Sequence, residues 1–525
     1  MDISRLYHTL RHLKAEQWLY RGWYKLKKKL YTSPANINIP VQQAIVFGHK
    51  DLYHLHGEEC YDSNSNTFTF LNISHQFRGK IDWEFEGYGK LWTYNLNYFN
   101  WLSDEGIDIE ERLKTIHKYL DSKMHITGSE PYPISLRGIQ WIRFLAQNNI
   151  FEKQILETLY KDYHRLAAFP EYHLQANHLL ENGFSLFYAA HFFNDKDFYE
   201  PAHKILAGQL KEQILPDGGH YELSPMYHCI ILQRLLQCIE LQNLSDRFKN
   251  GALHLQMEYT AQSMLGWLKD FVYEDGSYAM MGDAAPGIAL SATELFKYAE
   301  HLQIKPAARK LKESGYRKYT GSRYELLVDA GNILPAYQPG HAHADTFSFC
   351  LNVNGKPIIV DTGISTYEKN KRRLEERGTA AHNTISVDGR NSSDVWDGFR
   401  TGRKASVSIT EDSRHKLVAT HNGYAYLGIT HERAFEAESS RIVISDRLKG
   451  HKGQEAYFHI HFHPSCIVKQ ASPTSFIADN IIINIQGGTG ATLVNYLYCS
   501  GYNKTEPGIR LRIHVEEHAV VSIEL

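Results

Sequence analysis

The feature of this sequence that most limits its possible folds is a change of residue pattern near residue 318. Before it, apolar residues recur at three- and four-residue spacing, which is typical of amphipathic helices. Short breaks rich in Pro and Gly separate these segments, and helices joined by short turns pack as antiparallel pairs. The spacing predicts helices at Ile107–Leu120, Leu136–Gln147, Ile155–Ala168, Leu179–Phe193, Ala202–Ile214, Met226–Leu241, Ala252–Leu268 and Ala292–His301.

After residue 318 the sequence consists of short runs rich in β-branched and aromatic residues. Turn residues interrupt them about every ten positions, which is typical of an antiparallel β-sandwich. Because 525 residues exceed what one hydrophobic core serves, we expect two domains, residues 1–317 and 318–525. The predicted strands are Tyr324–Val328, Thr346–Val353, Ile358–Val360, Asn383–Val387, Ala405–Ile409, Lys416–His421, Phe435–Ser439, Ile442–Asp446, Ala456–Phe462, Ser475–Ala478, Ile481–Ile485, Ala491–Tyr498 and Ile509–Val520.

Composition excludes some classes of protein. A net charge of −2 indicates neither a nucleic-acid-binding protein nor an acidic tail. The 6 cysteines lie far apart without CxxC spacing, so we expect free thiols in a reducing compartment. The N-terminus shows no apolar core and no cleavage site of a signal peptide, so we expect a cytoplasmic protein. The 33 tyrosines, 24 phenylalanines and 8 tryptophans suit either carbohydrate stacking or a large core.

The first thirty residues are both basic and aromatic, with Lys27, Lys28 and Lys29 close to Trp18 and Trp23. Two interpretations are open for residues 1–30. The segment either lies on an anionic membrane surface, or forms a solvated helix that packs on its own domain.

Residues 339–387 concentrate chemically useful side chains. An HxHxD group (His341, His343, Asp345) is followed by a DTG that contains Asp361 and by an HNT that begins at His382. Alternation from Asp345 to Val353, followed by Asn354-Gly355, predicts a tight β-hairpin. If the strand extends back to His341, both histidines project toward one face. The register of that hairpin sets Asp361 well away from His343, so a bend or loop has to close the gap.

Two clusters of polar residues fall in the helical half. In QANHLLENG, Asn177 and Glu181 share one helix face with His178 at its edge, although a capped helix start explains the same residues. In PDGGHYELSPMYH, Ser224 suits an N-cap before Pro225. Tyr227 then lies near a helix N-terminus, where the dipole favours a phenolate.

An amide, a phenol and imidazoles suit β-elimination from a uronic acid. Charge builds on the carboxyl group as the carbon 5 proton leaves, so the enzyme must neutralise that group, remove the proton and protonate the oxygen leaving carbon 4. Asn177 or a protonated Glu181 suits the first task. A Tyr and a His suit the other two.

The chain resembles the heparinase II/III family of polysaccharide lyases over nearly its full length. The resemblance implies an α+β multidomain fold, an incomplete (α/α) toroid followed by an antiparallel β-sandwich, with an acidic polysaccharide or oligosaccharide held between the two. The matching pieces are LWTYNLNYFNWL (91–102), PYPISLRGIQW (131–141), NHLLENG (177–183), PDGGHYELSPMYH (216–228), GHAHADTFSF (340–349), VDTG (360–363) and RGTAAHNTISVDG (377–389).

The resemblance also implies roles for individual residues. Asn177 or Glu181 neutralises the carboxyl group, and His178, Tyr227 and His341 share the acid and base work. The implied substrate-binding residues, which lie in the matching pieces, are Glu181, Glu222, Arg137 and Trp92. A divalent metal, zinc in well-known members, is implied as a structural cofactor on His343, Asp361 and His382.

Well-known members of the family are exported, whereas this chain shows no signal sequence. We therefore expect work inside the cell, in capsule or exopolysaccharide assembly, with membrane association through residues 1–30 as an option. Two other functions stay open. A glycoside hydrolase needs paired carboxylates, for which Glu181, Glu222 and Asp283 are candidates. A non-catalytic polysaccharide-binding factor predicts that Tyr227→Phe leaves function intact.

Overall fold

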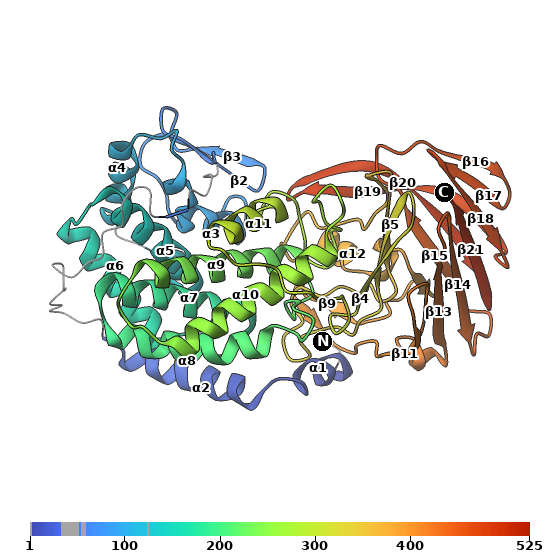
Figure 1. Cartoon of the computed structure of the whole chain (residues 1–525), viewed down its shortest axis with the longest axis horizontal. Coiled ribbons are helices and arrows are strands. Elements are labelled where there is room, and N and C mark those ends of the chain that lie inside the picture. The colour runs from blue at the N-terminus through green and yellow to red at the C-terminus, as the bar shows by residue number, and fades with distance from the viewer. Residues whose placement is uncertain (1–2, 33–51, 54–58, 123–124) are drawn as a thin grey trace.

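A computed structural model describes residues 3–32, 52–53, 59–122 and 125–525 of the chain. Helices form its first part and sheets its second, with the helical layer at one end of the long axis and the sheets at the other (Figure 1). All the predicted helices are confirmed, with ends that differ by a few residues. The main helices are α2 (Ala15–Leu30), α3 (Lys90–Tyr98), α4 (Ile109–Leu120), α5 (Pro131–Asn148), α6 (Lys153–Ala168), α7 (Ala176–Phe193), α8 (Lys196–Gln213), α9 (Pro225–Leu244), α10 (Gly251–Phe271) and α11 (Ala292–His301).

Local chemistry explains where these helices begin. The Ser224 side chain accepts a hydrogen bond from the Tyr227 backbone N–H at 3.3 Å, and Pro225 occupies the first turn, as the sequence predicts. At α11 the Ser291 and Glu294 side chains form a capping box. α7 and α9 are buried on nearly all sides, so their sequences are apolar almost throughout rather than on a single stripe.

Three sheets make up most of the second part of the chain. The strands from which the sequence predicts a β-sandwich are present there. An eight-stranded sheet has the order β11-β12-β13-β14-β21-β18-β17-β16, and two four-stranded sheets have the orders β19-β20-β15-β8 and β4-β5-β6-β7. The strands are β4 (Tyr316–Thr320), β5 (Tyr324–Asp329), β6 (Phe349–Val353), β7 (Lys356–Ile359), β8 (Ile385–Val387), β11 (Val407–Asp412), β12 (Lys416–His421), β13 (Thr430–Ala437), β14 (Arg441–Lys449), β15 (Ala456–His461), β16 (Val468–Ser472), β17 (Ser475–Ala478), β18 (Ile481–Gln486), β19 (Gly490–Gly501), β20 (Lys504–Val515) and β21 (His518–Glu524).

Two strand predictions are wrong in part. The run Ile509–Val520 is not one strand, because β20 ends at Val515 and β21 begins at His518. The sequence shows no Gly or Pro at that reversal, so its apolar pattern looks continuous. The predicted strand before the Asn354-Gly355 turn begins only at Phe349, which leaves His341 and His343 in a loop. The turn itself is confirmed, with φ of 52° at Asn354 and 72° at Gly355.

Strand β6 joins the two cores. Phe349, Leu351 and Val353 pack into the core of the sandwich, whereas Cys350 between them packs into the core of the helical part. Both faces of this strand are therefore buried, and the loop that carries His341 is held at the junction of helices and sheets. α11 ends at His301 and β4 begins at Tyr316. The domain limit at residue 317 stays a prediction.

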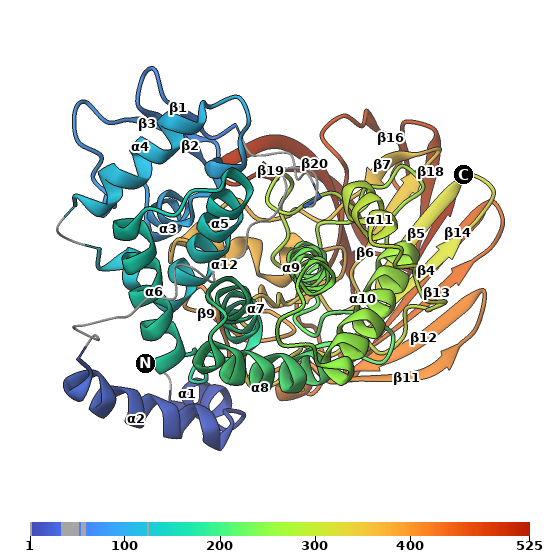
Figure 2. The ribbon, with the colours of Figure 1, turned by 60° about the vertical axis from the view of Figure 1, so that its left-hand side comes forward.

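Helix α2 packs on the helical part, as one of the two interpretations of residues 1–30 expected, whereas the preceding α1 (Ile3–Leu10) contacts the second part through Arg5 and Asp394. Helix α2 runs along the base of the helical part (Figure 2). The Tyr24 hydroxyl donates to the Pro170 carbonyl and Gln17 donates to the Leu174 carbonyl, while Trp18 and Trp23 remain about half exposed. In the described part of the chain, no helix has the length and apolar content to cross a membrane. Contact of the exposed face with a membrane surface stays a prediction.

Candidate active site

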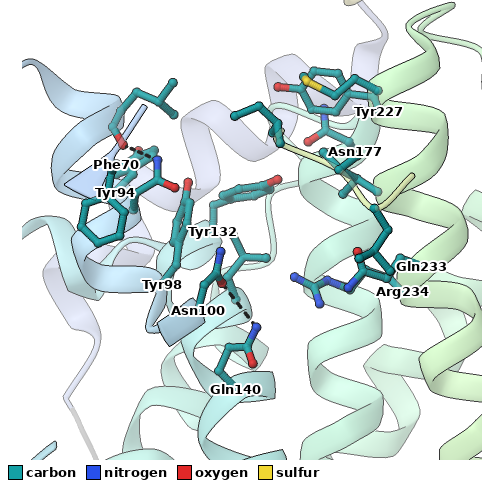
Figure 3. A pocket seen from close by; sticks show the side chains of 18 of the residues that line it. Phe70, Tyr94, Tyr98, Asn100, Tyr132, Gln140, Asn177, Tyr227, Gln233 and Arg234 are labelled. Carbon is teal, nitrogen blue, oxygen red and sulfur yellow. Dashed lines mark hydrogen bonds between the residues drawn. The ribbon is translucent and has the colours of Figure 1, made fainter. Parts of the chain in front are cut away.

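One large cavity opens where the helices meet the sheets, with a volume of about 1000 Å³. Tyr94, Tyr98 and Tyr132 form one wall, while Asn177 and Tyr227 face it from the other side (Figure 3). His341, from the loop before β6, and Tyr502, from the turn between β19 and β20, complete the lining from the sheet part. The cavity therefore draws residues from both halves of the chain.

Asn177 lies at the start of α7 and is hydrogen-bonded to Glu222. Its side-chain NH₂ donates to the two carboxylate oxygens of Glu222 at 2.9 and 3.2 Å. Both residues line the cavity although each is nearly buried. Burial raises the pKa of Glu222, which favours its protonated form. This pair brings an amide and a carboxyl group that is readily protonated to one point on the wall.

His341 is oriented by a buried carboxylate. Its Nδ1 lies 2.8 Å from Asp283 Oδ2, and its Nε2 lies 3.5 Å from the Asn177 amide nitrogen. Although burial opposes ionisation, the Arg373 guanidinium and the neighbouring histidines hold the pKa of Asp283 well below its usual range. Because Asp283 is ionised, His341 Nδ1 carries the hydrogen and donates it. In a neutral imidazole that donates through Nδ1, Nε2 is the acceptor.

The Tyr227 ring lies against the His341 ring, with ring centroids 3.9 Å apart and the ring planes tilted by 31°. Its hydroxyl lies 3.2 Å from the hydroxyl of Tyr367. Burial raises the pKa of Tyr227 well above its usual value, so the phenol stays protonated at neutral pH. The expectation of a phenolate is therefore wrong, because burial favours the neutral form of Tyr227. A neutral phenol is suited to donating a proton.

His178 lines the cavity and contacts Glu171, with 3.2 Å between Nδ1 and Oε1. Asn182 holds the same carboxylate, donating to Oε2 at 3.1 Å. Burial lowers the pKa of His178, but the Glu171 carboxylate outweighs it and the net pKa is raised. The imidazolium form is thus favoured on the cavity wall. Glu171 was not among the predicted residues, since nothing in its local sequence marks it.

Asp283 is the centre of a buried cluster that fixes the sheet side of the site. Arg373 donates to both of its carboxylate oxygens, and His343 Nε2 lies 2.8 Å from Oδ1. Asp283, Arg373 and His343 are all fully buried. Asp283 is a candidate for the paired carboxylates of a hydrolase, but these partners occupy both of its oxygens and it does not line the cavity.

Three of the predicted substrate-binding or neutralising residues do not line the cavity. Trp92 is fully buried among aromatic rings and donates to the Ile73 carbonyl. Arg137 is buried and pairs with Asp162 at 2.7 Å. Glu181 lies behind the cavity-lining Arg234, with 3.3 Å between the charged atoms. Trp92, Arg137 and Glu181 are therefore not in a position to contact a substrate in this cavity directly.

The proposed metal ligands lie close together but do not converge. His382 Nδ1 is 2.7 Å from Asp361 Oδ2, and the His343 and His382 rings have centroids 5.3 Å apart. Two imidazoles and a carboxylate have suitable chemistry, yet Asp361 and His382 are directed at each other. Within the described residues, no group of three or more His, Cys, Asp or Glu side chains is arranged to hold a metal. The zinc site stays a prediction, and no step below uses it.

Backbone conformations of positive φ occur where the site helices begin. Gln175 and Ala176, just before Asn177, have φ of 69° and 56°, and Leu223, just after Glu222, has φ of 57°. Such conformations are costly for residues other than Gly and persist where the surroundings enforce them. The Gln175 side chain is held by Glu16 of α2 at 3.1 Å. The N-terminal helix thus supports the turn that presents Asn177.

Comparison with known families agrees with this arrangement. The family described as Heparinase II/III N-terminus matches residues 133–312, and the one described as Heparinase II/III-like, C-terminal matches residues 303–523. The chain therefore belongs to the heparinase II/III family. It is 23% identical over 351 residues to a heparin-sulfate lyase of Bacteroides stercoris, an alignment that covers 59% of this chain and 49% of the relative.

A heparin-sulfate lyase of Pedobacter heparinus is 23% identical over 383 residues, covering 66% of this chain and 54% of the relative. The chain thus spans about half the length of these curated relatives. Among solved structures, heparinase III matches with a TM-score of 0.65 and 13% identity, covering 100% of this chain and 94% of that one. Heparan sulfate lyase HepC from Pedobacter heparinus matches with a TM-score of 0.54 and 14% identity, covering 97% and 88%. The fold is the helical toroid followed by a β-sandwich that the sequence predicts.

Proposed function

We propose that the protein is a polysaccharide lyase that cleaves a uronate-containing polysaccharide or oligosaccharide by β-elimination. One observation carries this proposal. Asn177, Tyr227 and His341 come from three separate segments and face one cavity, with the phenol and the imidazole in contact. Membership of the heparinase II/III family and the names of the relatives support the same reaction class.

The negative charge of the sugar carboxylate has to be neutralised before carbon 5 can lose its proton. Asn177, His178 and Glu222 all line the cavity, where an amide, an imidazolium and a protonated carboxyl offer hydrogen-bond donors. Donors aimed at the carboxyl oxygens stabilise the charge that builds there as carbon 5 loses its proton. These residues lower the barrier by binding the carbanionic state more strongly than the ground state.

Tyr227 and His341, whose rings are in contact, carry out the proton transfers. His341 Nε2, left as an acceptor by the Nδ1–Asp283 contact, removes the carbon 5 proton, and the resulting imidazolium is stabilised by Asp283. The electron pair of the C–H bond forms the carbon 4–carbon 5 double bond as the bond from carbon 4 to the bridging oxygen breaks. Tyr227 donates its proton to that oxygen. No water is consumed, and the products are a new hydroxyl end and an unsaturated uronate.

A place inside the cell, in polysaccharide assembly, is also proposed. The 6 cysteines are free, which is compatible with a reducing compartment, and cell fractionation tests the location directly. The hydrolase alternative needs two carboxyl groups that flank the substrate, and of its three candidates only Glu222 lines the cavity.

The decisive experiment follows absorbance near 232 nm, a rough marker of the unsaturated uronate that elimination creates, with purified protein and a panel of acidic polysaccharides. We expect a rising signal with wild type and a loss of about 10²–10⁴-fold in rate with Tyr227→Phe, the usual range for removing a general acid. Tyr367→Phe is the matched control, because it removes the other hydroxyl of the same pair. Reducing ends released without the absorbance would indicate hydrolysis instead.

A further inference from the structure

The outward side of helix α2 is apolar although it is exposed to solvent. Leu19, Leu26 and Leu30 recur at the spacing of one helix face, and 71%, 59% and 80% of their surfaces are exposed. Trp18 and Trp23 flank them, each about half exposed. We call these five side chains the outer apolar face of α2. Single exposed apolar residues are common, but a contiguous row of them marks a surface that binds something.

The opposite side of α2 already holds the helix on the helical part. Gln17 and Tyr24 are buried there, and the Tyr20 ring stacks on Tyr172 with ring centroids 4.6 Å apart. Within the described part of the chain, no hydrophobic core includes a side chain of the outer apolar face. Both views place α2 on the outer edge of the molecule, next to α8 (Figure 1 and Figure 2). The outer apolar face is therefore available to a partner.

The short helix α1 adds exposed apolar side chains at the same edge. Ile3 and Tyr7, one helical turn apart, are 83% and 61% exposed. Because α1 contacts the second part of the chain through Arg5 and Asp394, this edge of the molecule spans both parts. A partner that binds here meets apolar side chains from two consecutive helices.

Basic residues accompany the apolar ones. Residues 3–32 contain eight Lys and Arg residues and a single acidic one, Glu16. Lys25, Lys28 and Lys29 are exposed toward the end of α2, and no described residue forms an ion pair with them. Their positive charges are therefore free to attract an anionic partner.

The neighbouring carboxylates do not cancel this charge. Asp394 lies 2.9 Å from Arg5, and Glu212 contacts Lys14, so each is paired with one of the eight basic residues. Even with Glu16 counted against a third, most of the basic residues of this segment remain uncompensated. The edge formed by α1 and α2 carries an excess of positive charge.

The positive charge continues beyond these helices. Lys404, from the second part of the chain, lies near Arg11, and burial together with the Arg11 charge lowers the pKa of Lys404 to about 8. Like charges from two distant segments thus meet at this edge. An extended anionic surface fits such an arrangement better than a single small ligand does.

The composition of this surface distinguishes between kinds of partner. Lys is depleted in interfaces between proteins, so three exposed lysines beside the apolar row argue against a second copy of the chain. Trp and Leu on one face of a helix, with Lys and Arg around them, are typical of helices that lie in the surface of an anionic membrane.

We propose that α1 and α2 dock the protein on an anionic lipid membrane. Trp18 and Trp23 enter the headgroup region, and Lys25, Lys28 and Lys29 contact the lipid phosphates. The helices lie on the membrane surface and do not cross it. This inference goes beyond the proposed function and does not depend on it.

Vesicle co-sedimentation of the full chain tests the docking. One set of vesicles contains about one third phosphatidylglycerol in phosphatidylcholine, and the other contains phosphatidylcholine alone. We expect binding at least about tenfold tighter to the anionic vesicles, because each basic residue near the surface adds to the attraction. Added salt should weaken it, since salt screens exposed charges. No binding to either set, which is the result if something else covers the face, or equal binding to both, overturns the proposal.

A double variant of the apolar row tests which residues make the contact. Leu19→Ser with Leu26→Ser should lower affinity for the anionic vesicles about tenfold or more, with thermal unfolding unchanged. The matched control is Leu255→Ser with Ile467→Ser, which replaces side chains 65% and 66% exposed on α10 and just before β16. The control should bind as wild type does. Equal losses in the two double variants would contradict the role of α2.

A charge variant tests the electrostatic part independently. Replacing Lys25, Lys28 and Lys29 together by Gln should lower affinity for the anionic vesicles about tenfold and leave the weak binding to neutral vesicles unchanged. The control replaces three lysines exposed elsewhere, Lys153, Lys249 and Lys371. An equal effect of this control would show that only net charge matters and would overturn the assignment to α2.

Sedimentation velocity without lipid tests the other occupant of the face. We expect the same oligomeric state for wild type and for Leu19→Ser with Leu26→Ser. A wild-type dimer that this variant converts to a monomer would identify a second copy as the partner and refute membrane docking. A failure to detect elimination products leaves the vesicle results unaffected, so the two proposals fail separately.

Discussion

Replacement of Asp283 by Asn tests the centre of the site. The substitution keeps the shape but removes the charge that Arg373 and His341 contact at 2.6 and 2.8 Å. Arg373 is fully buried, and leaving such a charge without its partner costs about 3–5 kcal/mol. A domain commonly has about 5–15 kcal/mol of stability, so we expect a folded but weakened protein. His341 also loses the anion that stabilises its imidazolium, so kcat should fall about 10²–10⁴-fold.

Urea unfolding and the initial rate near 232 nm, a rough marker of product formation, measure the two effects. A double variant, Asp283→Asn with Arg373→Gln, separates charge from shape: it should be more stable than Asp283→Asn alone, because the uncompensated charge is gone. The role given to Asp283 would be refuted if Asp283→Asn lost less than about 1 kcal/mol of stability and less than about threefold in rate. The first loss is smaller than that for breaking a buried ion pair, and the second is smaller than that for impairing a general base.

Three further outcomes follow from the structure. Because Glu171 raises the pKa of His178, kcat/KM should fall as pH rises through that raised pKa. Glu171→Gln should move this fall to lower pH. An unchanged pH profile would contradict the role of the imidazolium. Gln17→Ala removes the hydrogen bond from α2 to the Leu174 carbonyl, in the turn before Asn177. We expect thermal unfolding to show a loss of about 1 kcal/mol of stability, together with a raised KM. A change in stability alone would mean that the helix does not act on the site. Metal analysis of protein purified without chelator tests the zinc prediction, and a His343→Ala protein of unchanged metal content would refute it.

Much of the fold was predictable from the sequence because its signals are local. The helices between residues 100 and 310 follow from apolar spacing, and Ser224 with Pro225 marks the start of α9. The Asn354-Gly355 turn follows from the positive φ that these residues accept. Where local signals were weak the prediction failed, as at the reversal after Val515.

The sequence by itself determined the candidates for the chemistry, Asn177, Tyr227 and His341, because the motifs around them resemble those of one family. Only the tertiary structure decided that they face one cavity and which groups surround them. Asp283 is 58 residues from His341 and Arg373 is 90 residues from Asp283. Their effect comes from burial and close contact, which residue spacing does not encode. The same physical reason, desolvation in the folded interior, makes Tyr227 a neutral phenol rather than the phenolate expected from its place on the helix.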